Sequence, residues 1–145
     1  AGGAAMGNVM AGGPGRDSFV LNIPSNVSAV RATNDDDGVA SAGDAVVGTF
    51  NVVVDYEAGE PLVLGAGSAV GSPVEFDAAG HPIVPDGQYA ALRGDLSTAT
   101  EFVVDPQGDD LLIVFDDAAI PSDSAAYQGS VVLLGVADAG TVLIG

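Results

Sequence analysis

The hydrophobic positions of this chain lie in short runs that end at Gly, Pro or Asp. Most runs are rich in Val, Ile, Leu and Phe, and polar turn residues separate them at intervals of about ten residues. Such spacing is typical of the strands of a sandwich or barrel. The runs that predict strands are 19–23, 27–32, 46–56, 62–64, 74–76, 82–84, 101–104, 111–115, 131–136 and 141–144.

Two connections between these runs have the residues that turns require. Segment 77–80 (Asp-Ala-Ala-Gly) predicts a hairpin, because Gly80 stands where a positive φ is commonly needed. Segment 105–110 (Asp-Pro-Gln-Gly-Asp-Asp) lies between 101–104 and 111–115 and predicts a second strand-turn-strand unit.

Helical patterns are weak by comparison. Glycine makes up 21 of the 145 residues, and no window keeps helical periodicity beyond two turns. We expect at most one short helix, near 97–100 or 122–127. The sequence thus predicts an all-β fold: a single antiparallel β-sandwich or barrel-like domain over 18–145, with an extended Gly-rich N-terminal arm over 1–17.

The N-terminal arm has little to contribute to a core. Its first fifteen residues contain six Gly, and the only sizeable apolar side chains are Met6, Val9 and Met10. Two interpretations stay open: an extended arm that packs on a neighbouring subunit, or a frayed terminus. Ala1 fits removal of an initiator Met as well as cleavage of a signal peptide, and we favour Met removal.

Charge adds the environment to this picture. The chain has 20 acidic residues, three Arg and no Lys, for a formal net charge of −17. In dilute buffer the compact state would repel itself, a cost that screening removes when the Debye length falls to about 3 Å at 1 M salt. Because 48% of the residues are hydrophobic and the acids are spread among apolar runs, the chain is expected to fold. It resembles proteins of haloarchaea and their viruses.

The same composition excludes several classes of partner and site. No Lys/Arg cluster is present to displace counterions from phosphates, so neither nucleic acid nor an anionic membrane surface is an expected partner. No apolar stretch approaches the roughly 20 residues that span a bilayer. The absence of Cys excludes disulfides, thiolate zinc sites and a Cys nucleophile.

Candidate catalytic groups are few. His81 is the only imidazole, and it follows Gly80 in a predicted turn, where side chains are exposed by default. Triad chemistry requires a nucleophile beside the imidazole in a pocket, so we expect no catalytic residue, no enzyme activity and no cofactor. A small β-rich hydrolase, which would need converging Asp residues in a pocket, ranks last.

Neighbouring carboxylates are the candidate metal sites. Such pairs bind Ca²⁺ or, at suitable separation, hydrolyse glycosides. With 16 Asp in the chain, neighbours also arise by chance, and segment 34–38 lacks the downstream Glu of an EF-hand. We therefore prefer a solvated acidic face to a specific cation site. The candidate ligands are Asp35, Asp36, Asp37, Asp109, Asp110, Asp116 and Asp117.

The remaining short motifs have low information. Segments 12–15 (GGPG) and 65–67 (GAG) lack the Lys and Ser/Thr of a phosphate-binding loop. Segment 93–95 (Arg-Gly-Asp) spells an adhesion tripeptide, which we attribute to chance. Asn26 begins an N-x-S sequon that matters only where the chain meets a glycosylation machinery.

One local pattern resembles a known family. Segment 74–85 (VEFDAAGHPIVP), preceded by 58–64 (AGEPLVL) and followed by Gly-rich β segments ending in 141–144 (TVLI), is similar to head decoration proteins of tailed viruses. That resemblance implies a small β-rich protein with an N-terminal arm that forms trimers on the outside of an icosahedral capsid. The strand count and size also resemble single jelly-roll capsid proteins.

The leading hypothesis is a structural virion protein of a haloarchaeal virus, an outer decoration or cement subunit. A shell protein of a tailed virus faces packaged DNA, whereas an outer subunit faces brine, which suits a chain without basic clusters. Its expected partners are copies of itself, in a trimer or larger assembly on the virion surface, and a major capsid protein. The alternatives are a single jelly-roll capsid protein and a cell-surface or filament subunit of a haloarchaeon.

Overall fold

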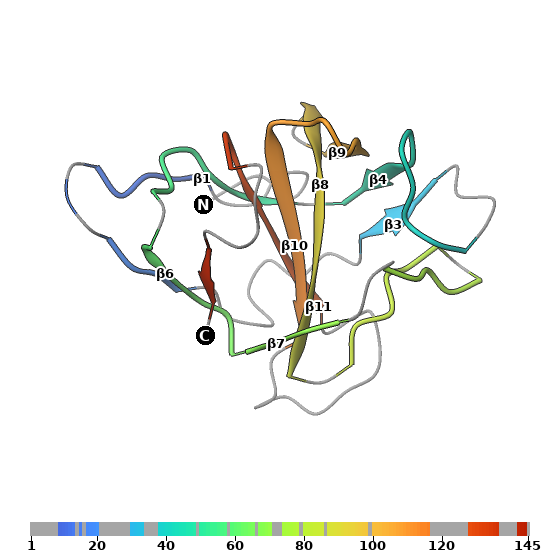
Figure 1. The fold of residues 1–145 in the computed structure, drawn as a ribbon, viewed down its shortest axis with the longest axis horizontal. Coiled ribbons are helices and arrows are strands. Elements are labelled where there is room, and N and C mark those ends of the chain that lie inside the picture. The colour runs from blue at the N-terminus through green and yellow to red at the C-terminus, as the bar shows by residue number, and fades with distance from the viewer. Residues whose placement is uncertain are drawn as a thin grey trace.

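Two β-sheets make up the fold (Figure 1). The computed structural model describes residues 9–13, 15, 17–20, 30–33, 38–48, 50–57, 59–65, 67–70, 74–78, 80–85, 87–98, 100–116, 128–136 and 142–144. All regular elements among these residues are strands, which confirms the predicted all-β class. Within these ranges no helix is long and apolar enough to cross a membrane.

The larger sheet, sheet A, has nine strands, in the order β1-β5-β11-β10-β8-β9-β4-β3 with β7 paired to β8. Sheet B has three, in the order β12-β6-β2. In Figure 1 the long strands β8, β10 and β11 stand at the centre, with β6 and β12 to one side and β3 and β4 to the other. The strands of sheet A are β1 (Val9–Met10), β3 (Arg31–Ala32), β4 (Ala45–Val47), β5 (Asn51–Val53), β7 (Ser68–Ala69), β8 (Gln88–Thr98), β9 (Glu101–Val104), β10 (Asp110–Asp116) and β11 (Gln128–Leu133). Those of sheet B are β2 (Phe19–Val20), β6 (Pro61–Val63) and β12 (Leu143–Ile144).

Strand direction is mixed, whereas the sequence predicted antiparallel sheets. The run β11-β10-β8-β9-β4-β3 is antiparallel. Parallel pairs join β1 to β5, β5 to β11, β7 to β8, and both pairs of sheet B. Sheet A is open, with β1 and β3 at its edges, so the arrangement is sandwich-like and not a closed barrel.

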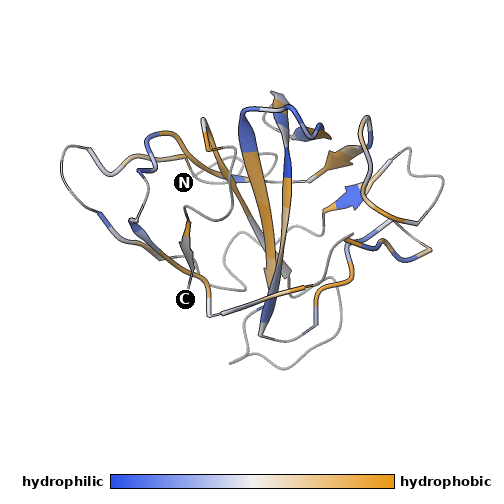
Figure 2. Cartoon of the chain, in the orientation of Figure 1, coloured by the Kyte–Doolittle hydropathy of each residue, from blue (hydrophilic) through white to orange (hydrophobic). Residues whose placement is uncertain are grey.

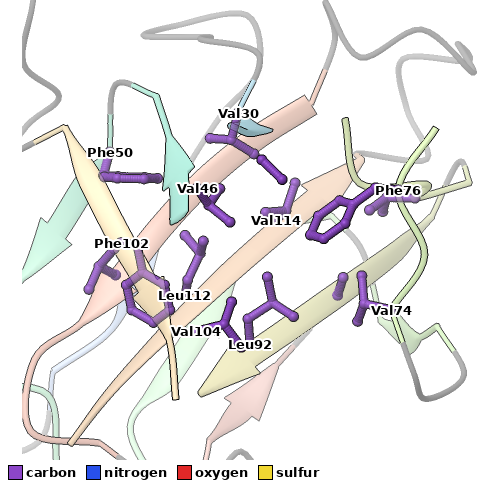
Figure 3. Packing of buried hydrophobic residues seen from close by; sticks show 14 of the residues in the cluster. Val30, Val46, Phe50, Val74, Phe76, Leu92, Phe102, Val104, Leu112 and Val114 are labelled. Atoms are coloured by element: carbon purple, nitrogen blue, oxygen red, sulfur yellow. The ribbon is translucent and has the colours of Figure 1, made fainter. Parts of the chain in front are cut away.

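Strand β10 is the shared wall of two hydrophobic clusters because its residues alternate between the two faces of sheet A. Leu112 and Val114 belong to cluster 1, with residues such as Phe50, Phe76 and Phe102 (Figure 3). The intervening Leu111, Ile113 and Phe115 belong to cluster 2 on the opposite face, which contains Leu62 of sheet B. Each of these five β10 residues is at most 2% exposed, and Figure 2 shows β10 as a hydrophobic band with hydrophilic ends. A strand buried on both faces has a continuous run of apolar residues in its sequence, as 111–115 does.

The predicted single strand 46–56 is wrong. It forms two strands, β4 and β5, that lie in distant parts of sheet A. The break follows Gly48, whose N–H donates to the Thr100 carbonyl and whose Cα faces Val30 so closely that a Cβ would lie 2.5 Å from Val30 Cγ1. This contact turns the chain out of β4 before β5 begins.

At most one short helix was expected, and at the first of its two positions Ser97 and Thr98 end strand β8 instead. The alternative helix at 122–127 lies outside the described residues. Strand β8 also separates the two predicted partners of the second strand-turn-strand unit: β9 and β10 each pair with β8 and not with each other.

Turn 105–110 is fastened to β8 by the Arg-Gly-Asp tripeptide. Arg93 Nε donates to the Gly108 carbonyl at 2.7 Å, and Asp95 Oδ1 accepts the Asp109 N–H at 3.1 Å. Gly94 and Gly108 are in backbone contact, since a Cβ on Gly108 would lie 2.6 Å from Gly94 Cα. The tripeptide therefore braces a surface turn of its own chain.

The hairpin predicted at 77–80 is confirmed. Phe76 and Pro82 form an antiparallel bridge, and Gly80 has φ of 87°. Its tip lies on the β3 edge, where the Gly80 carbonyl accepts the Ala32 N–H at 2.8 Å. The hairpin thus covers one edge of sheet A with residues of the same chain.

Candidate functional site

The described part of the N-terminal arm lies along the other edge of sheet A. Strand β1 pairs in parallel with β5, with Val9 opposite Val52 and Met10 opposite Val53. The Val54 N–H continues this ladder to the Met10 carbonyl at 3.0 Å. The sequence left open a neighbouring subunit or a frayed end for this segment; its described residues pair with β5 of their own chain, and packing on a neighbouring subunit stays a prediction.

Beyond β1 the arm is held by a carboxylate. Asp55 Oδ1 accepts the Gly12 N–H at 2.8 Å, and Oδ2 accepts the Gly13 N–H at 2.7 Å. Because these bonds favour the ionised form, chiefly the one from Gly12 and then that from Gly13, the pKa of Asp55 is lowered from its ordinary value. Two consecutive N–H groups thus bind one carboxylate in the manner of an anion-binding nest.

A second carboxylate binds the arm further on. Glu60 Oε2 accepts the Asp17 N–H at 2.7 Å, while Oε1 accepts the Glu57 N–H at 2.7 Å. Glu60 is only 2% exposed, so both acceptor oxygens lie out of solvent and are matched by backbone donors. We call Asp55 and Glu60 together the arm clasp.

A tight turn positions the arm clasp between β5 and β6. The Glu60 N–H donates to the Glu57 carbonyl at 3.1 Å, and Gly59 has φ of 87°, the conformation that a type II turn requires at its third residue. Tyr56 anchors the turn: its ring is buried 6.2 Å from that of Phe19, and its hydroxyl donates to the Glu60 carbonyl at 2.6 Å. The two carboxylates therefore project from a braced segment.

Glycine is needed in the arm at the point where it meets the clasp. A Cβ on Gly12 would lie 2.6 Å from Asp17 Cγ, so the Asp17 side chain folds back against the glycine. Asp17 Oδ2 is buried there without a hydrogen-bond partner. Any larger residue at position 12 would have to displace this carboxylate.

The arrangement suits binding of a peptide backbone. It provides strand pairing at β5, two carboxylate oxygens for adjacent N–H groups at Asp55, and one buried oxygen for a further N–H at Glu60. A Gly-rich segment fits because its backbone approaches the carboxylates without side chains in the way. The carboxylates bind main-chain donors, and Met10 adds side-chain packing against cluster 2.

His81 is half-buried, whereas the sequence predicted an exposed side chain at the tip of a turn. Its Nδ1 lies 3.0 Å from the Val30 carbonyl oxygen, and since a carbonyl only accepts, Nδ1 carries the proton. The backbone N–H of His81 donates to Asp77 Oδ1 at 3.0 Å. His81 therefore fastens the hairpin to the chain next to β3.

Two of the candidate metal ligands, Asp109 and Asp110, have structural contacts: Asp110 accepts backbone hydrogen bonds, and Asp109 donates its backbone N–H within a turn. Asp110 Oδ1 accepts the Gly135 N–H and Oδ2 accepts the Leu96 N–H, each at 2.9 Å. Asp109 is exposed on the turn held by Asp95. Over the described ranges, no three His, Asp or Glu side chains converge in a way that would hold a metal ion.

The other candidates are placed as follows. The carboxylate of Asp116 is fully buried at the end of β10, and its backbone carbonyl accepts the Gly87 N–H at 2.8 Å. The candidate ligands and sequon that lie outside the described residues are Asp35, Asp36, Asp37, Asp117 and Asn26.

Sequence analysis did not single out the arm clasp. Glu57 and Glu60 both lie between the apolar runs 46–56 and 62–64, and nothing in the sequence marks Glu60 as the buried one. The donors themselves belong to residues 12–17, more than forty positions away, and backbone N–H groups leave no mark in a sequence.

The arm clasp and the covered β3 edge are therefore the two features of the fold that bear on function. Both rest on contacts between segments distant in sequence. Comparison with known protein families, with curated proteins and with solved structures finds no match to this chain.

Proposed function

We propose that this chain is a structural subunit of an assembly exposed to concentrated salt, specifically an outer capsid decoration or cement subunit of a haloarchaeal virus. The observation that carries the proposal is the N-terminal arm, a segment without net side-chain charge that is held on a β-domain by strand pairing and carboxylates. Such a segment is a binding element without a catalytic group. No enzyme activity is proposed.

The charge supports the setting. A net charge of −17 with no Lys leaves short hydrated carboxylates on the surface, which suits a protein facing brine. A shell subunit around packaged DNA would need cationic groups toward the phosphates. A position on the outside of a virion fits this composition better.

The jelly-roll alternative has less support. Jelly rolls are double-sheet antiparallel structures, whereas sheet A here has nine strands and parallel pairs at β1, β5 and β11. A cell-surface or filament subunit of a haloarchaeon remains the second candidate, because the same arm could join successive subunits. Glycan on Asn26, detected by mass spectrometry of native protein, would favour it over the virion subunit.

Sedimentation in molar salt tests the assembly part of the proposal. We expect closed oligomers, a trimer or larger, that dissociate or unfold on dialysis below about 0.1 M salt as screening is lost. Monomers at every salt concentration, or oligomers that stay assembled and folded at low salt, would contradict it. An image of the native particle would then distinguish a capsid surface from a filament.

A further inference from the structure

We propose that the N-terminal arm is exchanged between copies of the chain, so that Val9–Gly13 of one copy occupies the β5 edge and Asp55 of another, while Asp17 stays bound to Glu60 of its own copy. The inference rests on the proposed function, because it requires a subunit that associates with itself. It names the occupant of the site as the same segment of a second copy.

The contacts that hold the arm do not depend on which copy supplies it. They consist of the β1–β5 ladder, backbone N–H bonds from Gly12 and Gly13 to Asp55, and the packing of Met10 against cluster 2. An arm from a second copy would make the same bonds at the same distances. Exchange of an identical element is a low-cost route to an oligomer for this reason.

The connection between arm and domain permits the exchange. Phe19 is buried in cluster 2 at 6% exposure and fixes the point at which the chain leaves the domain. Gly15, at φ of 99°, lies between the Gly13 contact to Asp55 and the Asp17 contact to Glu60, in a conformation that glycine leaves without strain. The four Cα–Cα steps from Gly13 to Asp17 span about 14 Å when extended, enough to bring β1 to a domain packed directly against this one.

Charge favours this segment as the crossing point between acidic domains. The first fifteen residues carry no charged side chain, in a chain with 20 acids. An arm that crosses to a neighbour therefore adds no repulsion of its own. Val9 is 62% exposed and Val54, beside the arm, is 43% exposed, so apolar surface also remains open for a second domain to cover.

Cross-linking can distinguish an arm bound to its own copy from one bound to another, because the chain has no Cys. One sample carries V9C and a second carries V54C; both sites are exposed, so the core is unchanged. The two are mixed as monomers at low salt, assembled in molar salt, and treated with a short bismaleimide. A V9C–V54C heterodimer forms efficiently only when an arm lies on another copy.

The matched control replaces V54C by I83C, whose site is 47% exposed and lies on the far hairpin. We expect the V9C–V54C heterodimer in yields about tenfold above this collisional control, since docking raises the local concentration. Adding D55N to the V54C copy should lower that yield.

Two outcomes would overturn the proposal: one contradicts arm exchange alone, and the other also contradicts the proposed assembly. If oligomers sediment in molar salt but the V9C/V54C double variant cross-links only within single chains, arm exchange is wrong and the assembly proposal stands. If every sample sediments as monomer, both proposals are wrong.

Discussion

The two edges of sheet A are closed by different means. At β3 the chain covers its own edge with a hairpin whose Gly80 and His81 bind the backbone of Ala32 and Val30. At β1 the edge consists of a two-residue strand held through carboxylates, with Val9 largely exposed. Edge strands expose unpaired backbone groups that invite association, so proteins normally protect them. One edge here is protected by a hairpin of the domain, the other by a short N-terminal strand and the carboxylates that hold it.

Substitution at Gly80 should have the largest effect, because it breaks the β3 edge. An alanine Cβ there would lie 2.5 Å from the Ala32 carbonyl oxygen, and φ of 87° adds backbone strain. We expect G80A to lower the free energy of unfolding by about 3 kcal/mol, measured by denaturant unfolding in molar salt.

Gly43 provides the matched control for that prediction. It has φ of 92°, but no other atom lies within 4 Å of the position that an alanine Cβ would take, so G43A carries the strain without the clash. We expect a loss of about 1 kcal/mol. Equal losses for G80A and G43A would mean that the hairpin contact adds nothing to the β3 edge.

Substitution of Glu60 should have an intermediate effect and act on the β1 edge. E60Q places an amide N–H₂ where one of two backbone donors, from Asp17 or Glu57, needs an acceptor. We expect a loss of about 2 kcal/mol in the same unfolding assay, together with faster proteolysis within the arm. E57Q changes an exposed side chain on the same turn, and a comparable loss in that control would count against the clasp.

Lowering the pH should have the smallest effect, limited to release of the arm. The folded pKa of Asp55 lies below its unfolded value, so its contribution is complete above the ordinary aspartate pKa of about 3.9 and is lost as pH falls through the folded pKa. We expect amide exchange at Gly12 and Gly13 to accelerate in that window, after correction for intrinsic rates. D55N should show fast exchange at both amides already at neutral pH; protection unchanged by D55N would contradict the prediction.

Local pattern was enough to predict the strands that are buried on both faces and the hairpin with its glycine. Run 111–115 is continuously apolar because both its faces are covered, and Gly80 marked its turn correctly. Strand β8, the longest in the fold, was not predicted, because its buried positions include the small Ala90 and Gly94 and give little hydrophobic contrast.

Long-range pairing could not be predicted. Nothing local in 46–56 showed that Gly48 would be pressed against Val30 and split the strand. The arm clasp is harder still, since its ligands are backbone groups at the far end of the chain. Sequence reasoning therefore identified the arm as a feature, and the structure supplied its binding site.

Strand β10 has a consequence for the way this protein unfolds. Its residues 111–115 divide between clusters 1 and 2. If either cluster were lost, one face of β10 would be exposed to water, and the strand would no longer support the other cluster. The two layers therefore form a single cooperative unit, with hydrogen exchange from the centre of β10 as slow as global opening. The N-terminal arm lies at the edge of sheet A with Met10 packed against cluster 2, and we expect it to open more often than that unit.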